Sequence, residues 1–443
     1  MNFVPETHKT GATQSLLVPW DGSLPFATIA GSNPRGIYEF GGITYKISDA
    51  VLYSVTSAGV VATIGIIEGS NRCIMRDDGA NLIITTLTEF SPPTLSTGLV
   101  VTAGNSVAFL NGFAIYDVSD GKFLMSDFGD PDNFQTNNFA TAESSPDDLK
   151  FVFVFNERAY LMGSRSIETW YISTGNPPLQ KTQNGTMPVG LKDIHSVAAS
   201  QNFVYFRGDD GWIYRFSSTQ ATNITSSFAA SAFETFGNDT AEAYVREYQG
   251  GTYYVINFTA NNQTWVFSER NHSLSPGIDD WFQLSSGEDL DSYIGAGYFK
   301  AFNKHLIEKK GSGDILQLDL DTYTDDGSVI VRVRETPPVN GAALGKPGGR
   351  LEMSWLEILM KKGVGTASGA GVDPKIYIQG TFDGANSYSN QEEVEIGRTG
   401  EAMMKVRWYH SESFYEASFK IIGYDPVFYS IHGASIGLKF LGD

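Results

Sequence analysis

Cysteine is nearly absent from this sequence of 443 residues, because Cys73 is the only one. A single thiol excludes an internal disulfide, and its place in the strand-like segment Arg72–Met75 favours a buried, unreactive side chain. No segment approaches the roughly 18 to 20 apolar residues that cross a bilayer, so we expect no membrane span. The opening MNFVPETHKTGATQ has neither a basic start nor an apolar core, which predicts no secretory signal and a protein soluble in the cytoplasm where it is made.

Helical patterning is also scarce, since no segment sustains an apolar period of 3.6 residues. Charged residues make up only 18% of the chain, whereas aromatic residues reach 13% and glycines number 47. This composition is typical of short strands joined by many turns. The sequence therefore predicts an all-β fold.

The stretch His195–Ser217 shows the strand pattern most clearly. Ser196–Ala199, Phe203–Arg207 and Trp212–Phe216 each have the length and alternation of a strand, and Gly-Asp-Asp-Gly forms the turn before the third. A three-stranded meander is too small to be stable alone. It must pack its apolar faces on copies of itself, and similar units recur along the chain.

The recurring units have a regular spacing. Their third strands align on Phe123, Ile167, Trp212, Trp265 and Ile315, at separations of 44, 45, 53 and 50 residues. This spacing is typical of four-stranded blades and predicts a β-propeller. A shortened unit at Cys73–Leu87, interrupted by Ser91-Pro92-Pro93, leaves a choice between six and seven blades. We expect the tryptophans of the third strands, Trp170, Trp212 and Trp265, to pack within the blades.

Three consecutive domains are predicted. Residues 1–36 contain four prolines and no periodicity, which favours an extended N-terminal arm, and residues 37–326 hold the propeller. Residues 327–443 include a Gly/Pro/Ala linker at Val339–Arg350 and six strands without the blade spacing, which predict a C-terminal β-sandwich or platform domain. A long polar insertion lies between Phe128 and Leu149, and loops of this length usually carry contacts or function.

Negative charge is concentrated in one part of the chain. Residues from Gly327 onward hold 12 of the 31 Lys and Arg and 13 of the 50 Asp and Glu, which leaves 19 and 37, a balance of -18, for residues 1–326. An acidic surface repels nucleic acid, so duplex DNA that meets this region should pass it without binding. A surface that is acidic for solubility alone is the simpler explanation of the same charge.

Metal-binding residues do not gather in the sequence. The six histidines stand singly, without ligand spacing, at His8, His195, His272, His305, His410 and His432. Four aspartates suggest a calcium loop, at Asp319, Asp321, Asp325 and Asp326. Thr324 and Ile330 occupy the positions where an EF-hand needs Gly and Glu, so a turn that enters a strand is the better interpretation. We predict no metal and no cofactor.

Catalytic patterns are weak as well. The motif Gly433-Ala434-Ser435-Ile436-Gly437 matches a nucleophile elbow, but no helix and no later histidine follow it. A propeller glycosidase would need carboxylates from several blades at its axis. The carboxylates available for that role are Asp209, Asp210, Glu168 and Glu247. Since turn aspartates beside glycine are usually structural, we predict that the protein is not an enzyme and assign no catalytic residues.

Several phrases of the sequence occur together in an order that resembles a known family. They are RGIYEFGGITYKISDAVLYSV at Arg35–Val55, VAFLNGFAIYDVSDGKFLMSD at Val107–Asp127, FATAESSPDDL at Phe139–Leu149, RSIETWYISTGNPP at Arg165–Pro178, DTYTDDGSVIVRVRETP at Asp321–Pro337 and DPKIYIQGTFDGANSYSN at Asp373–Asn390. The chain resembles the packaged-DNA stabilisation proteins of short-tailed bacteriophages, also called tail hub or tail nozzle proteins. The resemblance extends over nearly the whole chain.

The resemblance implies a structural protein of the virion tail. It implies a homo-hexameric tube below the portal and its adaptor ring, with neighbours among tailspike, fibre and needle or plug proteins. It also implies that the tube closes the head after packaging and later conducts DNA into the host, without sequence-specific binding. The nearly neutral C-terminal region is expected to contact the ring above, because interface cores are poor in unpaired charge.

A second interpretation comes from another class of protein. The chain could instead be a carbohydrate-active propeller with an accessory β-sandwich, either a lectin or a glycosidase, for which we would expect a monomer with affinity for glycans. The two interpretations differ in assembly state and in affinity for sugars, and the sequence leaves both open.

Overall fold

The computed structural model describes residues 1–6, 16–86, 94–96, 99–102, 106–118, 122–131, 133, 139–141, 148–175, 178–277, 279–384 and 386–442. The Ser91-Pro92-Pro93 break and most of the polar insertion before Leu149 lie outside these ranges. The chain forms two compact units. We call residues 25–262 and 295–318 the propeller unit, and residues 1–24, 263–294 and 319–443 the composite unit.

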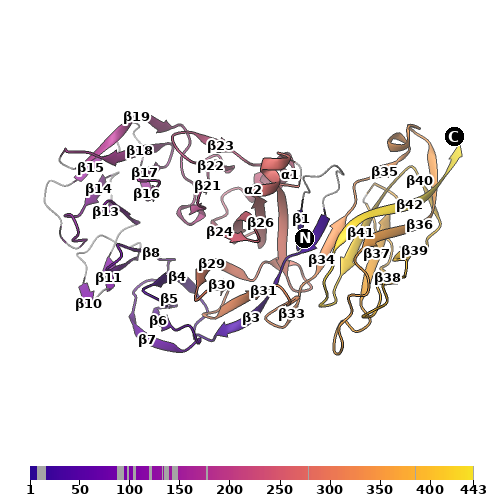
Figure 1. Ribbon diagram of the computed structural model, residues 1–443. Coiled ribbons are helices and arrows are strands. Elements are labelled where there is room, and N and C mark those ends of the chain that lie inside the picture. Colours follow the sequence, from indigo (N-terminus) through magenta and orange to yellow (C-terminus); the bar gives the residue numbers. More distant parts are fainter. Residues whose placement is uncertain are drawn as a thin grey trace. The chain divides into compact units, whose positions relative to one another are not determined.

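The propeller unit is built from consecutive four-stranded sheets, and Figure 1 shows the first of them with its strands side by side. The first sheet comprises β4 (Pro34–Phe40), β5 (Ile43–Ser48), β6 (Val51–Val55) and β7 (Val61–Ile66). The third comprises β12 (Val107–Leu110), β13 (Phe113–Val118), β14 (Lys122–Met125) and β15 (Phe139–Thr141). The fourth comprises β16 (Leu149–Phe155), β17 (Arg158–Gly163), β18 (Ile167–Ile172) and β19 (Leu179–Met187). The fifth comprises β20 (Ala198–Ala199), β21 (Val204–Arg207), β22 (Ile213–Phe216) and β23 (Ala221–Asn223), after the short 3-10 helix η1 (Ile194–Ser196).

The second sheet departs from the simple meander. It comprises β8 (Ile74–Asp77), β9 (Leu82–Thr85), β10 (Thr94–Ser96) and β11 (Leu99–Thr102), in the order β8-β9-β11-β10. Strand β11 pairs in parallel with β9, with Leu99 opposite Leu82, and antiparallel with β10. The unit that looked shortened in the sequence is therefore a full sheet whose last two strands are exchanged in position.

Two further strand groups complete the repeat. The sixth begins with β24 (Ala241–Tyr248) and β25 (Gly251–Phe258) in the propeller unit, whereas β26 (Gln263–Ser268), β27 (Trp281–Ser286) and β28 (Asp291–Ser292) belong to the composite unit. The seventh comprises β29 (Gly295–Ala301), β30 (Lys304–Lys309) and β31 (Ile315–Asp319), and the early strand β3 (Gly22–Ala27) is next in its order. Over the described residues the groups number seven, which decides between the two predicted blade counts.

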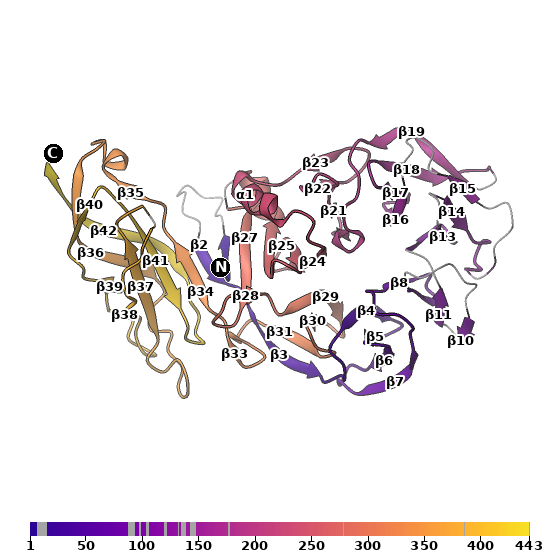
Figure 2. The ribbon, with the colours of Figure 1, turned by 180° about the vertical axis from the view of Figure 1, so that it is seen from behind.

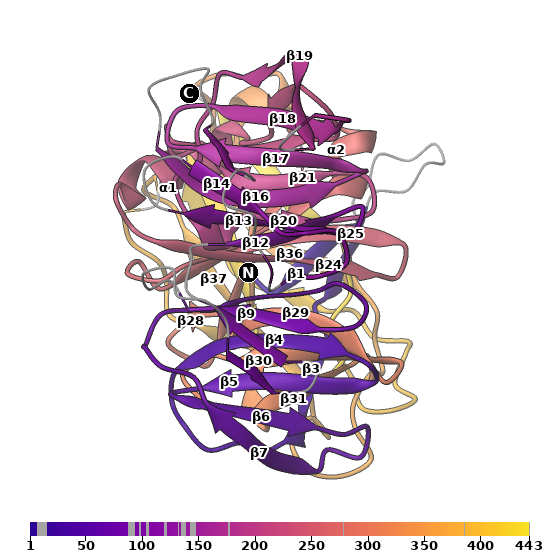
Figure 3. The ribbon, with the colours of Figure 1, turned by 90° about the vertical axis from the view of Figure 1, so that its left-hand side faces the viewer.

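The first strands of successive groups form a ring. Strand β29 contacts β4, β4 contacts β8, β8 contacts β12, and β12 contacts β16; β20 contacts β24, and β24 contacts β29. Figure 3 shows the outer strands β5, β6 and β7 of the first sheet stacked beside one another. Radial sheets around a ring of inner strands define a β-propeller, so the predicted all-β class and the propeller are confirmed.

Local turn chemistry explains why the strands reverse where they do. Asn111 and Gly112, between β12 and β13, have φ values of 49° and 85°. Both values lie in the left-handed region that two-residue hairpin turns of type I′ require, and Asn and Gly adopt it at low cost.

The predicted third strands at Phe123, Ile167, Trp265 and Ile315 fall on β14, β18, β26 and β31. Trp212 precedes β22 by one residue, so its predicted place on a third strand is wrong.

The composite unit contains two further sheets, most of whose strands are labelled in Figure 2. One sheet comprises β1 (Phe3–Glu6), β2 (Leu16–Pro19), β42 (Ile431–Gly442), β36 (Arg350–Met360), β39 (Arg407–Trp408) and β40 (Glu412–Phe414). The other comprises β34 (Arg332–Glu335), β35 (Val339–Asn340), β41 (Glu416–Gly423), β37 (Lys375–Thr381) and β38 (Glu392–Glu395). Buried side chains of both sheets, including Met353, Ile358, Ile378 and Phe419, form one hydrophobic cluster. Burial of this cluster is the main force that holds the two sheets together.

Residues 1–6 and 16–24 belong to the composite unit. The Asn2 side chain donates to the carbonyls of Ser285 and Val331 at 2.9 and 2.7 Å, and its Oδ1 accepts from the Ser285 amide. Strand β1 pairs with β2, and Leu17 of β2 lies opposite Ile431. The compact units are thus assembled from separated stretches of chain, and a division into consecutive domains at residues 36 and 326 stays a prediction.

Small elements join the strands. The helices are α1 (Ser227–Phe236), α2 (Glu269–Leu274) and the 3-10 turn η2 (Gly341–Leu344), while β32 (Thr324–Asp325) and β33 (Ser328–Val329) form a hairpin. Ser226 and Ser268 cap the two α-helices by accepting from backbone amides of the first turn. In the part of the chain that the structure describes, no helix is long and apolar enough to cross a membrane.

Candidate functional sites

A polar hollow of about 470 Å³ lies in the propeller unit, where its inner strands converge. We call it the axial cavity. Its wall is formed by residues 36–39 of β4, 72–76 at the start of β8, Phe151 of β16, 194, 195 and 197–199 around η1 and β20, 243–245 of β24 and 297–300 of β29. Six of the seven strand groups therefore contribute to it, and a cavity of this size accommodates a small molecule.

A buried network of charges lies behind one wall of the axial cavity. Lys46 of β5 and Glu308 of β30 are fully buried and form an ion pair. Arg72 joins them, with its Nη2 2.9 Å from Glu308 Oε2 and its Nη1 3.3 Å from Glu242 Oε2. Burial alone would raise the pKa of Glu308, but the charges of Lys46 and Arg72 hold it at about 2. The ionised carboxylate of Glu308 therefore stabilises the folded protein at any pH above the usual pKa of a glutamate, about 4.5. This contribution is lost as the pH falls from about 4.5 toward 2.

Among the histidines that the structure describes, His195 is the one that lines the axial cavity. Burial and, to a smaller degree, the charge of Arg72 lower the pKa of its imidazole to about 3. The ring is therefore neutral near pH 7, with one nitrogen as a donor and the other as an acceptor. Cys73 also lines the cavity; burial raises the pKa of its thiol, which agrees with an unreactive side chain.

Buried arginines organise the loops around the propeller unit. Arg35 is fully buried, and its guanidinium donates to the carbonyl oxygens of Asn71, Asp49, Ile67 and Glu68 at 2.7 to 2.8 Å. These bonds tie the end of the first sheet to the segment that begins the second. Sequence reasoning missed this role, since a single arginine before a glycine carries no pattern.

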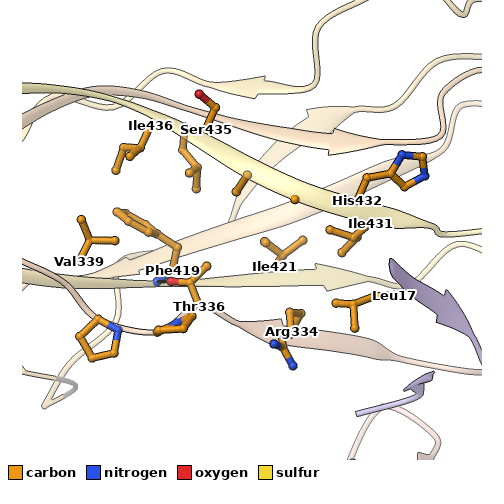
Figure 4. Close-up of a pocket in the computed structure, with 15 residues that line it drawn as sticks. Leu17, Arg334, Thr336, Val339, Phe419, Ile421, Ile431, His432, Ser435 and Ile436 are labelled. Atoms are coloured by element: carbon orange, nitrogen blue, oxygen red, sulfur yellow. Dashed lines mark hydrogen bonds between the residues drawn. The ribbon is translucent and has the colours of Figure 1, made fainter. Parts of the chain in front are cut away.

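The composite unit has an apolar groove of about 460 Å³ (Figure 4). Leu17 of β2, Phe419 and Ile421 of β41 and Ile431 of β42 lie along it, and Thr336 to Val339 form one rim. Most of these side chains belong to the hydrophobic cluster between the two sheets or pack against it. The groove is therefore an opening into that core, between β34, β41 and β42.

Ser435 of the Gly-x-Ser-x-Gly motif lies on the edge of this groove and inside the continuous strand β42, opposite Glu357 of β36. A nucleophile elbow requires a sharp strand-to-helix turn, which a residue within a paired strand does not have. His432, the nearest histidine in sequence, has its Nε2 3.1 Å from Ser430 Oγ. The expectation that this motif arises by chance agrees with the geometry.

The four carboxylates considered for a glycosidase each have local partners. Asp209 accepts from the Gly190 amide, and Asp210 accepts from the Trp212 amide and the Tyr214 hydroxyl. Glu168 pairs with Lys181 at 3.1 Å, and Glu247 accepts from Gln201 at 3.3 Å. None of the four lies in the wall of the axial cavity as the described residues form it. The structure does not bring them together at the axis.

The aspartates of the calcium-like stretch form turns. Asp326 and Gly327 have φ values of 49° and 81° between β32 and β33, as a two-residue hairpin requires, and Asp319 accepts from the Thr322 hydroxyl at 2.7 Å. Within the described ranges, no three His, Cys, Asp or Glu side chains come together as metal ligands would.

Asp325 is the exception among these aspartates, because it is buried. Its carboxylate accepts from Ser23 Oγ at 3.2 Å and from Ser286 Oγ at 3.4 Å. Burial raises the pKa of this carboxyl to about 7. A group whose pKa is raised on folding stabilises the protein at low pH, and this contribution is lost as the pH rises from about 4 through 7.

We expect Asp325→Asn to remove this pH dependence. Relative to the unmodified protein, the variant should gain roughly 2 to 3 kcal/mol of unfolding free energy between pH 5 and pH 8, since the amide does not ionise. Thermal melts of both proteins across that range measure the difference. Asp321→Asn, at an exposed position of the same stretch, is the matched control and should change little. Parallel pH profiles for Asp325→Asn and the unmodified protein would show that Asp325 is ionised throughout.

The geometry defines a β-propeller of seven strand groups with a polar cavity beside its inner strands. The family comparison agrees, because the model described as "Bacteriophage P22 Gp10, beta-propeller" among phage stabilisation proteins matches residues 1–323. The chain belongs to this bacteriophage family, as its sequence resemblance predicted. No curated protein matches the chain.

Solved structures share the architecture only loosely. A streptogramin B lyase is 10% identical with a TM-score of 0.39, covering 67% of this chain and 96% of its own. PorZ of Porphyromonas gingivalis is 11% identical with a TM-score of 0.38, covering 70% and 39%. An exo-β-1,3-galactanase from Phanerochaete chrysosporium is 10% identical with a TM-score of 0.27, covering 94% and 100%. At this level of similarity none of them carries an argument about activity.

Proposed function

We propose that this chain is the tail hub, or tail nozzle, protein of a short-tailed bacteriophage. Six copies form a tube that attaches below the portal and its adaptor ring, closes the head to retain packaged DNA and conducts the DNA during ejection. The match of residues 1–323 to the phage stabilisation family is the observation that carries the proposal. Tailspike, fibre and needle or plug proteins are the proposed further neighbours in the virion.

The charge of the chain supports a conduit rather than a DNA-binding protein. The balance of -18 over residues 1–326 opposes the phosphates of a duplex that passes within a Debye length, about 8 Å at physiological ionic strength. Each Lys or Arg that met a phosphate would add salt-dependent affinity and slow the passage. Repulsion does not retain DNA, so retention requires a closed gate or a separate plug.

A structural role without catalysis is part of the proposal. Glu168, Asp209, Asp210 and Glu247 are each held by neighbours within their own or the adjacent strand group. Glycoside hydrolysis needs two carboxyl groups facing one bond, which separate local contacts do not provide. The carbohydrate-active propeller therefore becomes the alternative outcome of the test below.

The assembly state of the purified full chain tests the proposal. We expect light scattering to give a ring of about 290 kDa, six times the 48.4 kDa chain, which joins isolated portal-adaptor assemblies and has no measurable affinity for glycans. A monomer of 48.4 kDa that binds glycans would overturn it in favour of the carbohydrate-active protein. A ring that fails to join portal-adaptor assemblies would contradict the proposed attachment.

A further inference from the structure

The wall of the axial cavity has a charge opposite to that of the chain. The wall contains three basic side chains, those of Arg72, Arg76 and Lys300, and one carboxylate, that of Glu39. The whole chain, by contrast, has 31 basic and 50 acidic residues. Three cations at one polar hollow of an acidic protein form a local attraction for anions.

Two carboxylates already neutralise the charge of Arg72, whereas Arg76 and Lys300 have no such partner among the described residues. Glu242 and Glu308 bind the two Nη atoms of Arg72, which also fixes its position. Among the described residues, neither Arg76 nor Lys300 forms an ion pair with a carboxylate. Arg76 Nη1 donates only to the carbonyl of the adjacent Met75 at 2.8 Å, and its guanidinium lies 5.8 Å from the ring centre of Phe153.

The surroundings of Arg76 make its charge costly without an anion. Burial lowers the pKa of its guanidinium, because the charged form loses contact with water. The negative charge of Asp77, which accepts the hydroxyl of Tyr38 at 2.6 Å, offsets part of this cost without forming an ion pair with Arg76. A bound oxyanion would restore the lost solvation with charge-assisted hydrogen bonds, and the planar fork of an arginine suits phosphate oxygens.

Neutral and aromatic groups complete the wall. His195 is uncharged near pH 7 and offers one N–H donor, so it adds a hydrogen bond without a further charge. Tyr38, Phe151, Tyr244 and Phe299 also line the cavity and supply flat apolar surface next to the cations. This combination fits a small molecule with a phosphate group at one end.

We propose that the axial cavity of the propeller is a binding site for a small phosphate-bearing molecule, held by Arg76 and Lys300. The source of the phosphate is either the inorganic ion or an ester such as a nucleoside monophosphate. The cavity of about 470 Å³ accommodates either one. The proposal concerns the propeller unit alone and does not depend on hexamer formation or on the passage of DNA.

Isothermal titration of the full chain with inorganic phosphate and, separately, with adenosine monophosphate tests the site. We expect at least one of them to bind, and Arg76→Gln to weaken its affinity by roughly 10- to 100-fold, the usual effect of losing hydrogen bonds to a charged group. Lys300→Gln, at an exposed position of the same cavity wall, should also weaken it, whereas Arg270→Gln, at an exposed position outside the cavity, should not.

The pattern of binding identifies the ligand. Equal affinity for both probes assigns the site to the phosphate group alone, and tighter binding of the nucleotide shows that the aromatic wall takes part. Lys300→Gln keeps the test decisive if Arg76→Gln fails to fold, because its side chain is exposed. Absence of binding by both probes, or binding that neither variant weakens, would overturn the proposal.

Discussion

Replacement of Glu308 by Gln should lower the unfolding free energy of the protein by about 3 to 5 kcal/mol, the usual cost of breaking a buried ion pair on one side. Glu308 is fully buried, and its two carboxylate oxygens face Lys46 Nζ and Arg72 Nη2. The amide removes the negative charge while both cations stay in place. Lys46, which has no water contact, then lacks the partner that offsets its desolvation, and Arg72 keeps only Glu242.

Chemical denaturation at a fixed protein concentration measures this effect. Glu247→Gln is the matched control, because that side chain is exposed and its contacts with Gln201 are long, at 3.3 Å; it should change stability by less than about 0.5 kcal/mol. The double variant Lys46→Met with Glu308→Leu should recover part of the loss, since it removes two buried charges together. A Glu308→Gln variant as stable as the control would mean that water reaches the pair.

Replacement of Trp265 by Ala should cost about 3 to 5 kcal/mol through the cavity it leaves. Trp265 lies on β26 with only 2% of its surface exposed, opposite Gln283 of β27. Its indole N–H donates to Gln263 Oε1 at 3.1 Å, so both the packing and a hydrogen bond are lost. The loss should appear as a lower midpoint in thermal unfolding.

Trp212→Ala is the control for the same change of side chain. Trp212 is only half-buried and precedes β22, so we expect about 1 kcal/mol or less. The ratio of the two effects separates packing within the strand group from a general effect of losing an aromatic ring. Equal losses for the two variants would contradict the packing assigned to Trp265.

The sequence by itself determined the repeating part of this protein. Strand length, alternation and turn residues act over a few neighbours, so Asn111-Gly112 and the third strands at Ile167 and Ile315 were predictable from their own surroundings. The exchanged order of β10 and β11 was not, because a parallel pairing depends on which edge is free in the assembled sheet. Trp212 falls just outside its strand for a similar reason, since a turn can shift a strand boundary by one residue.

Tertiary structure alone decided where the charges of the propeller lie. Lys46 and Glu308 are 262 residues apart, and nothing near either one in the sequence indicates an ion pair. They meet because the ring closes and brings the last strand group beside the first, at β29 and β4. The same closure places Arg76, Lys300 and His195 around one cavity. Side-chain periodicity encodes strands, whereas the meeting of distant charges depends on the ring that those strands build.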